Sequence, residues 1–334
     1  MAKLFFDSEG DLSLLNDKAV SVIGFGNQGE AQAQNLRDSG VKVVVGTKHD
    51  ASFEKARALG FDVVDVREAV GRANIHLLLV PDEIMPSVFE QDVLPHLQPG
   101  QAVVVSSGYN LYYEFLHYPP DIDVLMIAPR MIGTGVRNGY LDGKGFPSMV
   151  SVHQDASGKA KEIMLALCKA IGTLKMGSLE STVEEETVCD LFHEHFSYVY
   201  ILRRCYEILV EAGVSPEAAL LELWASGEEM ELCRVYMTHG LFHQLKLHSQ
   251  TSQYGQEVTG RLSPEEDGLE RQRLRKLISR IKDGTFAKEW ALEQLSGMPV
   301  WWRVHQENMS HPMITVEERL LDMLGVLERK DETR

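Results

Sequence analysis

Six short apolar runs, each followed by a stretch with helical periodicity, dominate the first part of the chain and limit what it can fold into. Strands that are apolar throughout are buried on both faces, as in parallel sheets covered by helices on each side. The sequence therefore predicts an α/β domain with a doubly wound parallel sheet. The six runs lie at 18–24, 41–46, 61–66, 75–81, 101–107 and 123–129.

The character of the sequence changes near residue 180. Beyond residue 182 the β-branched runs disappear, and stretches such as 191–213 carry apolar residues at helical spacing. A length of 334 residues also fits about two domains. We therefore expect a Rossmann-type domain over 1–181 and an all-helical domain over 182–328.

The charge balance narrows the classes of partner. The formal net charge is −16, and so acidic a surface repels nucleic acid and anionic membranes. The four cysteines form no CxxC unit, so we expect them to be reduced and mostly packed. No segment resembles a signal peptide or a membrane span, which predicts a cytoplasmic location.

Three glycines stand between the first predicted strand and its helix, with the spacing GxGxxG. Gly24 permits the tight turn, Gly26 lets a pyrophosphate approach the backbone, and Gly29 allows the helix to pack closely on the strand. The other reading is an ordinary glycine turn. In this context the motif predicts dinucleotide binding by the whole turn, residues Gly24, Phe25, Gly26, Asn27, Gln28 and Gly29.

The loop after the second predicted strand is where the adenosine ribose should lie. Asp50 can accept a hydrogen bond from the ribose 2′-hydroxyl, whereas Lys48 and Ser52 can hold a 2′-phosphate. The loop favours NAD and leaves NADP open as the alternative.

Two carboxylates further along share one face of a predicted helix. Asp190 and Glu194 are four residues apart, and such a pair can ligate Mg²⁺, which prefers oxygen ligands. The other reading of this spacing is a solvated helix face.

Matching segments along most of the chain resemble ketol-acid reductoisomerase of the short-chain class. The resemblance implies a nucleotide-binding α/β domain, a knotted helical domain that dimerises or forms a higher homo-oligomer, and two Mg²⁺ ions. It also implies that Asp190 bridges both ions, that Glu194 and Glu222 bind metal, and that Pro81 contacts the cofactor. The matching segments are DLSL (11–14), VIGFGNQG (22–29), NLRDSGV (35–41), VPDE (80–83), MIAP (126–129), VHQDASG (152–158), EETVCDLFHE (185–194), LVEAG (209–213), DGTFAKEW (283–290) and HP (311–312).

The chain departs from the family pattern at residues that handle protons. Ser107 stands where the family has a histidine, so a base that titrates near neutrality is lost there. Arg130 stands where the family has a lysine; it remains cationic but cannot give up a proton. We still expect both residues to be catalytic.

The second metal-binding helix of the family also differs here. Glu222 is followed four residues later by Ser226 where the family has a second glutamate, so Glu228 or Glu229 is expected to compensate, and Glu228 is a candidate for contact with the substrate. Ser249 matches the serine that contacts the substrate carboxylate.

Three functions follow as hypotheses. The first is a Mg²⁺- and NAD(P)-dependent enzyme of specialised metabolism that acts on a 2,3-dihydroxy or 2-keto-3-hydroxy acid. Its redox-neutral form oxidises the substrate, forms a C–C bond from an enolate, as in closure of a cyclopropanol ring, and reduces the product again. The second is an acetolactate reductoisomerase of branched-chain amino-acid synthesis. The third is a non-enzymatic dinucleotide-binding relative.

Overall fold

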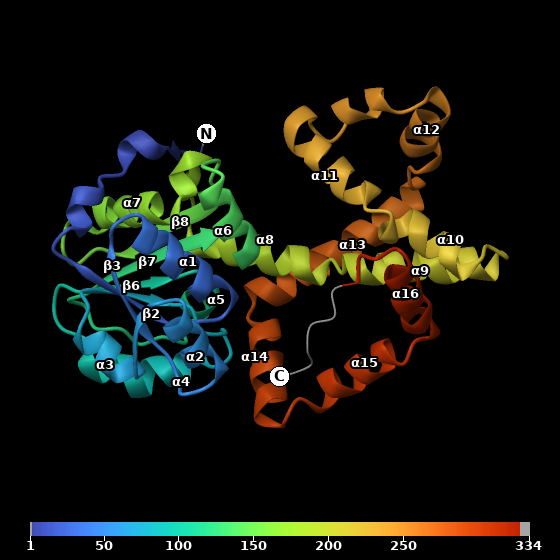
Figure 1. Cartoon of the computed structure of the whole chain (residues 1–334). Coiled ribbons are helices and arrows are strands. Elements are labelled where there is room, and N and C mark those ends of the chain that lie inside the picture. The colour runs from blue at the N-terminus through green and yellow to red at the C-terminus, as the bar shows by residue number, and fades with distance from the viewer. Residues whose placement is uncertain (1, 328–334) are drawn as a thin grey trace. The chain divides into compact units, whose positions relative to one another are not determined.

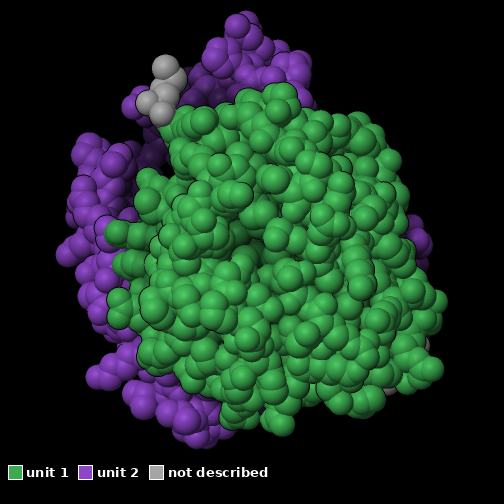
Figure 2. Space-filling view, turned by 90° about the vertical axis from the view of Figure 1, so that its left-hand side faces the viewer, with its two compact units in different colours: residues 1–191 green, residues 192–334 purple. Residues whose placement is uncertain are grey.

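The computed structural model describes residues 2–327 of the chain (Figure 1). Its internal contacts divide the chain into two compact units, unit 1 (Met1–Leu191) and unit 2 (Phe192–Arg334), coloured separately in Figure 2. The division falls within helix α8 (Val183–His195). The boundary expected at 181/182, just before this helix, stays a prediction.

Unit 1 contains a nine-stranded sheet of order β1-β9-β8-β7-β6-β5-β2-β3-β4. The six neighbouring strands β7, β6, β5, β2, β3 and β4 pair in parallel, and they coincide with the six predicted runs. Strand β8 pairs antiparallel with β7, and β1 pairs antiparallel with β9. The strands are β1 (Leu4–Phe5), β2 (Ala19–Ile23), β3 (Lys42–Gly46), β4 (Asp62–Val64), β5 (Ile75–Leu78), β6 (Ala102–Val105), β7 (Asp123–Pro129), β8 (Ser148–Gln154) and β9 (Ser178–Glu180).

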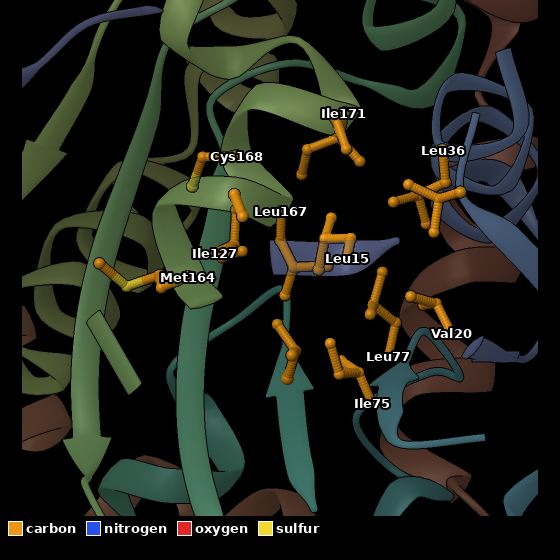
Figure 3. Packing of buried hydrophobic residues seen from close by; sticks show 14 of the residues in the cluster. Leu15, Val20, Leu36, Ile75, Leu77, Ile127, Met164, Leu167, Cys168 and Ile171 are labelled. Atoms are coloured by element: carbon orange, nitrogen blue, oxygen red, sulfur yellow. The ribbon is translucent and has the colours of Figure 1, made fainter. Parts of the chain in front are cut away.

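Helices cover both faces of this sheet, as the apolar strands require. Alternate residues of one strand enter different cores: Ile75 and Leu77 lie in the cluster of Figure 3, whereas Leu78 lies in the cluster on the other face. The helices of unit 1 are α1 (Asn27–Asp38), α2 (Ala51–Ala58), α3 (Val66–Gly71), α4 (Met85–Val88), α5 (Tyr109–Tyr112), α6 (Gly133–Leu141), α7 (Ala160–Ile171) and α8.

The strand order reverses direction at β2 and β5, which are neighbours in the sheet but not in the chain. At such a switch point the connections leave the sheet on opposite faces and open a crevice at the carboxyl ends of the strands. The glycine turn follows β2, and Pro81 and Asp82 follow β5. The fold thus brings both segments to one edge of the sheet.

Unit 2 is helical throughout its described residues, as predicted. Its buried core is small and centres on Tyr206, Ala219, Leu220 and Leu320. No helix in residues 2–327 is long and apolar enough to cross a membrane. Its helices are α9 (Tyr198–Glu211), α10 (Pro216–Leu220), α11 (Glu228–His239), α12 (Gln250–Tyr254), α13 (Pro264–Lys282), α14 (Thr285–Leu295), α15 (Pro299–Met309) and α16 (Pro312–Met323).

The cysteines are free thiols, as expected, but the expectation that most are packed is wrong. Only Cys168 is buried, on α7, whereas Cys189, Cys205 and Cys233 are exposed. The last two belong to unit 2, where the helices bury few of their residues.

Candidate active site

The three glycines of the turn after β2 meet different surroundings. Gly24 has a φ of +93°, and a Cβ atom placed on Gly29 would lie 2.1 Å from the carbonyl oxygen of Gly24. A Cβ on Gly26 would meet no atom within 4 Å. Gly29 is therefore required by packing, while the open space at Gly26, at the N-terminus of α1, fits a dinucleotide pyrophosphate.

The other residues of this turn have structural partners. The Phe25 ring is buried and packs edge-on against Phe61, with 5.5 Å between the ring centroids. The Gln28 side chain donates a hydrogen bond of 2.8 Å to the carbonyl of Met131. A Cβ on Gly133 would lie 2.0 Å from the carbonyl oxygen of Asn27, so the start of α6 packs directly on the turn. Contact of these residues with a cofactor stays a prediction.

The predicted ribose loop carries both signs of charge. The Asp50 carboxylate accepts a hydrogen bond of 2.9 Å from the Ser52 backbone N–H and thereby caps α2. Lys48 lines a pocket of about 380 Å³ together with Asp65 and Arg67. The capping role of Asp50 and Ser52 explains their positions without a ligand, so the choice between NAD and NADP stays a prediction.

Arg130 links two carboxylates of helix α8. It follows β7, and its Nη2 donates to Glu186 Oε1 at 2.6 Å while its Nη1 donates to Asp190 Oδ1 at 2.9 Å. Its buried Nε has no acceptor among the described residues. A lysine ammonium does not present this planar fork, so the arginine here fixes both carboxylates at once.

Glu186 is completely buried, and sequence reasoning missed it. Its second oxygen accepts a hydrogen bond of 2.7 Å from the backbone N–H of Gly108. Burial raises the pKa of Glu186, and the charge of Arg130 opposes that rise. The signal was present in the sequence, because Glu186, Asp190 and Glu194 follow one another at intervals of four residues.

Asp82, also missed, lies beside Ser107. Asn110 Nδ2 donates to Asp82 Oδ1 at 3.0 Å, and hydrogen bonding from both Asn110 and Ser107 acts to lower the pKa of the Asp82 carboxyl. Burial raises the pKa of Asp82 to about 6, against the lowering effect of these two hydrogen bonds. Its position directly after β5, at the switch point of the sheet, was the signal that the sequence offered. Pro81 precedes it, and the Pro81 carbonyl accepts from the Met85 N–H at 3.0 Å.

The predicted metal ligands fit Mg²⁺ in their chemistry but do not complete a site. Asp190 keeps a side chain that is 39% exposed, with one oxygen bonded to Arg130, and Glu194 lies one turn further along α8. Within residues 2–327, no three His, Cys, Asp or Glu side chains are grouped closely enough to hold a metal ion. Oxygen donors from elsewhere, including water, would have to complete the coordination shell.

The remaining predicted residues lie in unit 2. Glu222 lies in an exposed π-helical turn, Leu221–Ala225, and Gly227 with a φ of +78° separates this turn from α11. Glu228 begins α11, and its N–H donates to Ser226 Oγ at 3.3 Å. The exposed Ser249 caps α12 through the Ser252 N–H. The roles of Glu222, Glu228 and Ser249 towards metal or substrate stay predictions.

Comparison with known proteins covers nearly the whole chain. Residues 14–177 match the family model "Acetohydroxy acid isomeroreductase, NADPH-binding domain", and residues 183–325 match "Ketol-acid reductoisomerase, C-terminal domain".

Individual relatives give the same picture. The chain is 40% identical to putative ketol-acid reductoisomerase 3 of Saccharolobus solfataricus, over 95% of this chain and 96% of that protein. It is 38% identical to ketol-acid reductoisomerase (NADP(+)) of Methanopyrus kandleri, over 97% and 99% of the two chains. A solved NADH-preferring ketol-acid reductoisomerase from an uncultured archean superposes with a TM-score of 0.89 at 34% identity, covering 98% of this chain and 100% of that one. The chain therefore belongs to the short-chain class of the ketol-acid reductoisomerase family and is an NAD(P)-dependent enzyme.

Proposed function

We propose that this enzyme transfers hydride between a nicotinamide cofactor and a small 2-keto-3-hydroxy or 2,3-dihydroxy acid, with the help of Mg²⁺. One observation carries the proposal: polar groups gather where neighbouring parallel strands end. The open space at Gly26 follows β2, Asp82 follows β5, Ser107 follows β6, and Arg130, with its bond to Asp190, follows β7. Carboxyl ends of adjacent parallel strands share one edge of the sheet, which is where ligands bind in such folds.

The chain supplies orientation and proton handling in this proposal. Gly26 and the N-terminus of α1 hold the pyrophosphate, while Asp190 and Glu194 hold the cation, which polarises substrate oxygens when bound. Arg130 keeps the Asp190 carboxylate in one orientation. Ser107 presents a hydroxyl to the substrate side of the cluster. The negative surface of the protein makes such local positive charge necessary for an acidic substrate.

The family reaction is the first candidate. In it, an alkyl group shifts within a 2-hydroxy-2-alkyl-3-keto acid such as acetolactate, and hydride then reduces the new ketone. Identities of 37–40% to proteins named ketol-acid reductoisomerase support this reaction and its place in branched-chain amino-acid synthesis. The same family membership removes support from a non-enzymatic relative.

A rebuilt, redox-neutral reaction is the second candidate, favoured by Ser107 and Arg130. A bound oxidised cofactor would accept hydride from C2 while the 2-hydroxyl loses its proton, which would give a ketone. Loss of the C3 proton would then give an enolate, whose C3 attacks C5, expels a leaving group with its electron pair and closes the cyclopropanol ring. The reduced cofactor would return hydride to C2, and a proton would restore the hydroxyl. Changed proton-handling residues beside retained cofactor and metal-binding segments favour a changed substrate.

Two assays separate these candidates. Rapid oxidation of NADH or NADPH with acetolactate supports the family reaction and contradicts the rebuilt one. For the rebuilt reaction, deuterium at C2 of a 2,3-dihydroxy acid with a leaving group at C5 should reappear at C2 of the product. Deuterium that accumulates in the reduced cofactor without product would contradict it.

Removing the metal ligands tests what both candidates share. Asp190→Asn and Glu194→Gln should each abolish Mg²⁺-dependent turnover and weaken Mg²⁺ binding in calorimetry, because an amide lacks the carboxylate charge. Glu184→Gln, an exposed residue on the same helix, is the matched control. Unchanged Mg²⁺ affinity and turnover in both variants would refute the proposed site. The preference for NAD over NADP is tested by comparing the binding of the two reduced cofactors.

A further inference from the structure

Asp82 and Ser107 follow two strands that lie next to each other in the sheet. Strand β5 pairs in parallel with β6, with Leu78 opposite Val105, so the residues that follow these strands emerge side by side. The turn that carries Ser107 is tied to Asp82, because Asn110 Nδ2 donates to Asp82 Oδ1 at 3.0 Å, and a hydrogen bond from Ser107 lowers the pKa of the Asp82 carboxyl. Since a carboxylate only accepts, the proton of this bond comes from Ser107.

The Ser107 hydroxyl is oriented from a second direction. The backbone N–H of Tyr109 donates to Ser107 Oγ at 3.3 Å. With its own proton directed to Asp82, Oγ keeps a further lone pair that can accept from a substrate hydroxyl. Both side chains are half-buried, so the pair is held by the protein and remains open to a ligand.

Asp82 is itself fixed in place. Asn110, which is 1% exposed, donates from Nδ2 to the Asp82 carboxylate at 3.0 Å and to the Asp82 backbone carbonyl at 3.1 Å. These two hydrogen bonds from Asn110 fix the backbone of the turn after β5 and the orientation of the Asp82 carboxylate. The arrangement resembles the base and orienting group of other activated hydroxyls.

The charges around Asp82 favour its protonated form. Burial is the largest cause of the raised Asp82 pKa. The charges of Glu83, the next residue in the chain, and of Asp190 on α8 raise it further. Tyr109 of α5 also interacts electrostatically with Asp82. Arg130 lies on Asp190 and offsets part of that negative charge.

We propose that Ser107 and Asp82 form a proton relay for a substrate hydroxyl. The substrate O–H bond breaks and its proton goes to Ser107 Oγ, while the original Ser107 O–H bond breaks and that proton goes to an oxygen of Asp82. Reversal of these steps returns the proton when a ketone is reduced. Ser107 is the catalytic residue, and Asp82 is a positioning residue that acts through it.

This inference rests on the proposed function, so one test must not depend on turnover. Carboxyl ¹³C NMR of the full-length protein should show one resonance, absent in Asp82→Asn, that titrates near pH 6. Ser107→Ala removes a hydrogen bond to the ionised form and should move this midpoint upward. A titration midpoint near 4, in the ordinary range of aspartates, would overturn the relay whatever the substrate is. So would a midpoint that does not change in Ser107→Ala.

Kinetics then test the relay on whichever acid is turned over. Asp82→Asn should lower kcat/KM by roughly 100-fold near pH 7.5 and remove the acidic limb of the pH profile. In the Ser107→Ala background, Asp82→Asn should have little further effect, because the relay is already broken. Glu83→Gln, at an exposed neighbour whose charge raises the Asp82 pKa, is the control: it should keep the acidic limb and move it to lower pH.

Rescue separates a relay from a structural tie. Ser107→His introduces a group that titrates by itself, so the double variant D82N/S107H should recover activity and a pH limb of its own. An unchanged profile in Asp82→Asn, or a loss of activity with no change in the profile, overturns the relay. A protein whose Asp82 titrates as expected but that transfers hydride to none of the acids tested contradicts the proposed function instead.

Discussion

Arg130 shows how a single side chain determines the electrostatics of the candidate active site. Its guanidinium holds Glu186, which is completely buried, and Asp190, which is partly exposed. A buried carboxylate without a partner is strongly destabilising, whereas an exposed ion pair contributes little. The same substitution should therefore have very different effects at a buried and at an exposed arginine.

Arg130→Ala should lower the free energy of unfolding by about 3–5 kcal/mol, because Glu186 loses its buried partner. Arg130→Lys should fall between this variant and the wild type, since one ammonium group cannot reproduce both bonds. Urea denaturation measures the change. Arg67→Ala, which breaks an exposed pair with Asp92, is the control and should change stability by less than about 1 kcal/mol. Equal effects at Arg130 and Arg67 would contradict the burial argument.

His76 makes stability depend on pH. It is fully buried in β5, its Nδ1 lies 2.8 Å from Ser21 Oγ, and burial lowers the pKa of His76 to about 4. The unfolded chain takes up a proton near pH 6.5 while the folded chain does not. Stability attributable to this group should therefore fall between about pH 6.5 and 4, by up to about 1.4 kcal/mol for each pH unit.

His76→Asn should flatten that part of the stability curve, as measured by chemical denaturation across this pH range. The control is His117→Asn, at an exposed histidine outside the sheet. A slope that persists in His76→Asn would mean that another group binds the protons.

At the scale of elements, the glycine turn separates packing from binding. Gly26 and Gly29 are three residues apart in the chain. A Cβ atom on Gly29 would clash with the carbonyl oxygen of Gly24, whereas a Cβ atom on Gly26 would meet no atom within 4 Å. Gly29→Ala should lower stability by about 1–3 kcal/mol through overpacking against Gly24. Gly26→Ala should leave the melting temperature unchanged. It should weaken cofactor binding by about tenfold or more, because its methyl group enters the space proposed for the pyrophosphate. Thermal unfolding and fluorescence titration with NADH distinguish the two.

Gly108 gives a second prediction at this scale. A Cβ atom there would lie 2.5 Å from Thr187 Oγ1 and 2.7 Å from Glu186 Oε2, so Gly108→Ala should separate the turn after β6 from α8. We expect a loss of stability and of activity together, measured by urea denaturation and by the hydride-transfer assay. The control Gly71→Ala, on α3, meets no atom within 4 Å and should leave both unchanged.

The sequence predicted the six central strands because each is apolar throughout and bounded by turns. It did not predict β8, in which partly exposed residues interrupt the apolar pattern, or β1 and β9, which are two and three residues long. Such short strands exist because they pair with a preformed sheet, not because of local periodicity. Asp82 and Glu186 were missed for a related reason, since their partners Ser107, Asn110, Arg130 and Gly108 are distant in the chain.

On the scale of the whole molecule, unit 2 leaves many large apolar side chains exposed. Leu295 is 85% exposed and Leu292 56% exposed on α14, while Trp301 and Trp302 are about half exposed on α15. Within this chain these tryptophans are not core residues. So much exposed apolar surface is typical of a subunit interface, which supports the expected homodimer or higher homo-oligomer.

The mass of the protein in solution tests this expectation. Analytical ultracentrifugation at micromolar concentration should give a multiple of 37.5 kDa. Leu292→Glu, which places a charge among the residues lining an apolar pocket of about 590 Å³, should shift the mass towards the monomer. Lys288→Glu changes the charge at an exposed position of the same helix and should not. A monomeric wild-type protein would contradict the expectation.

Strand β1 has a practical consequence for handling the protein. Its Phe5 side chain is fully buried, and its backbone pairs with β9 at the edge of the sheet. Shortening the chain past Phe5, or crowding this strand with a purification tag, would leave the outer edge of β9 unpaired, although β9 still pairs with β8 on its other side. Bare strand edges recruit other chains, so aggregation during production would follow from damage far from any reacting group.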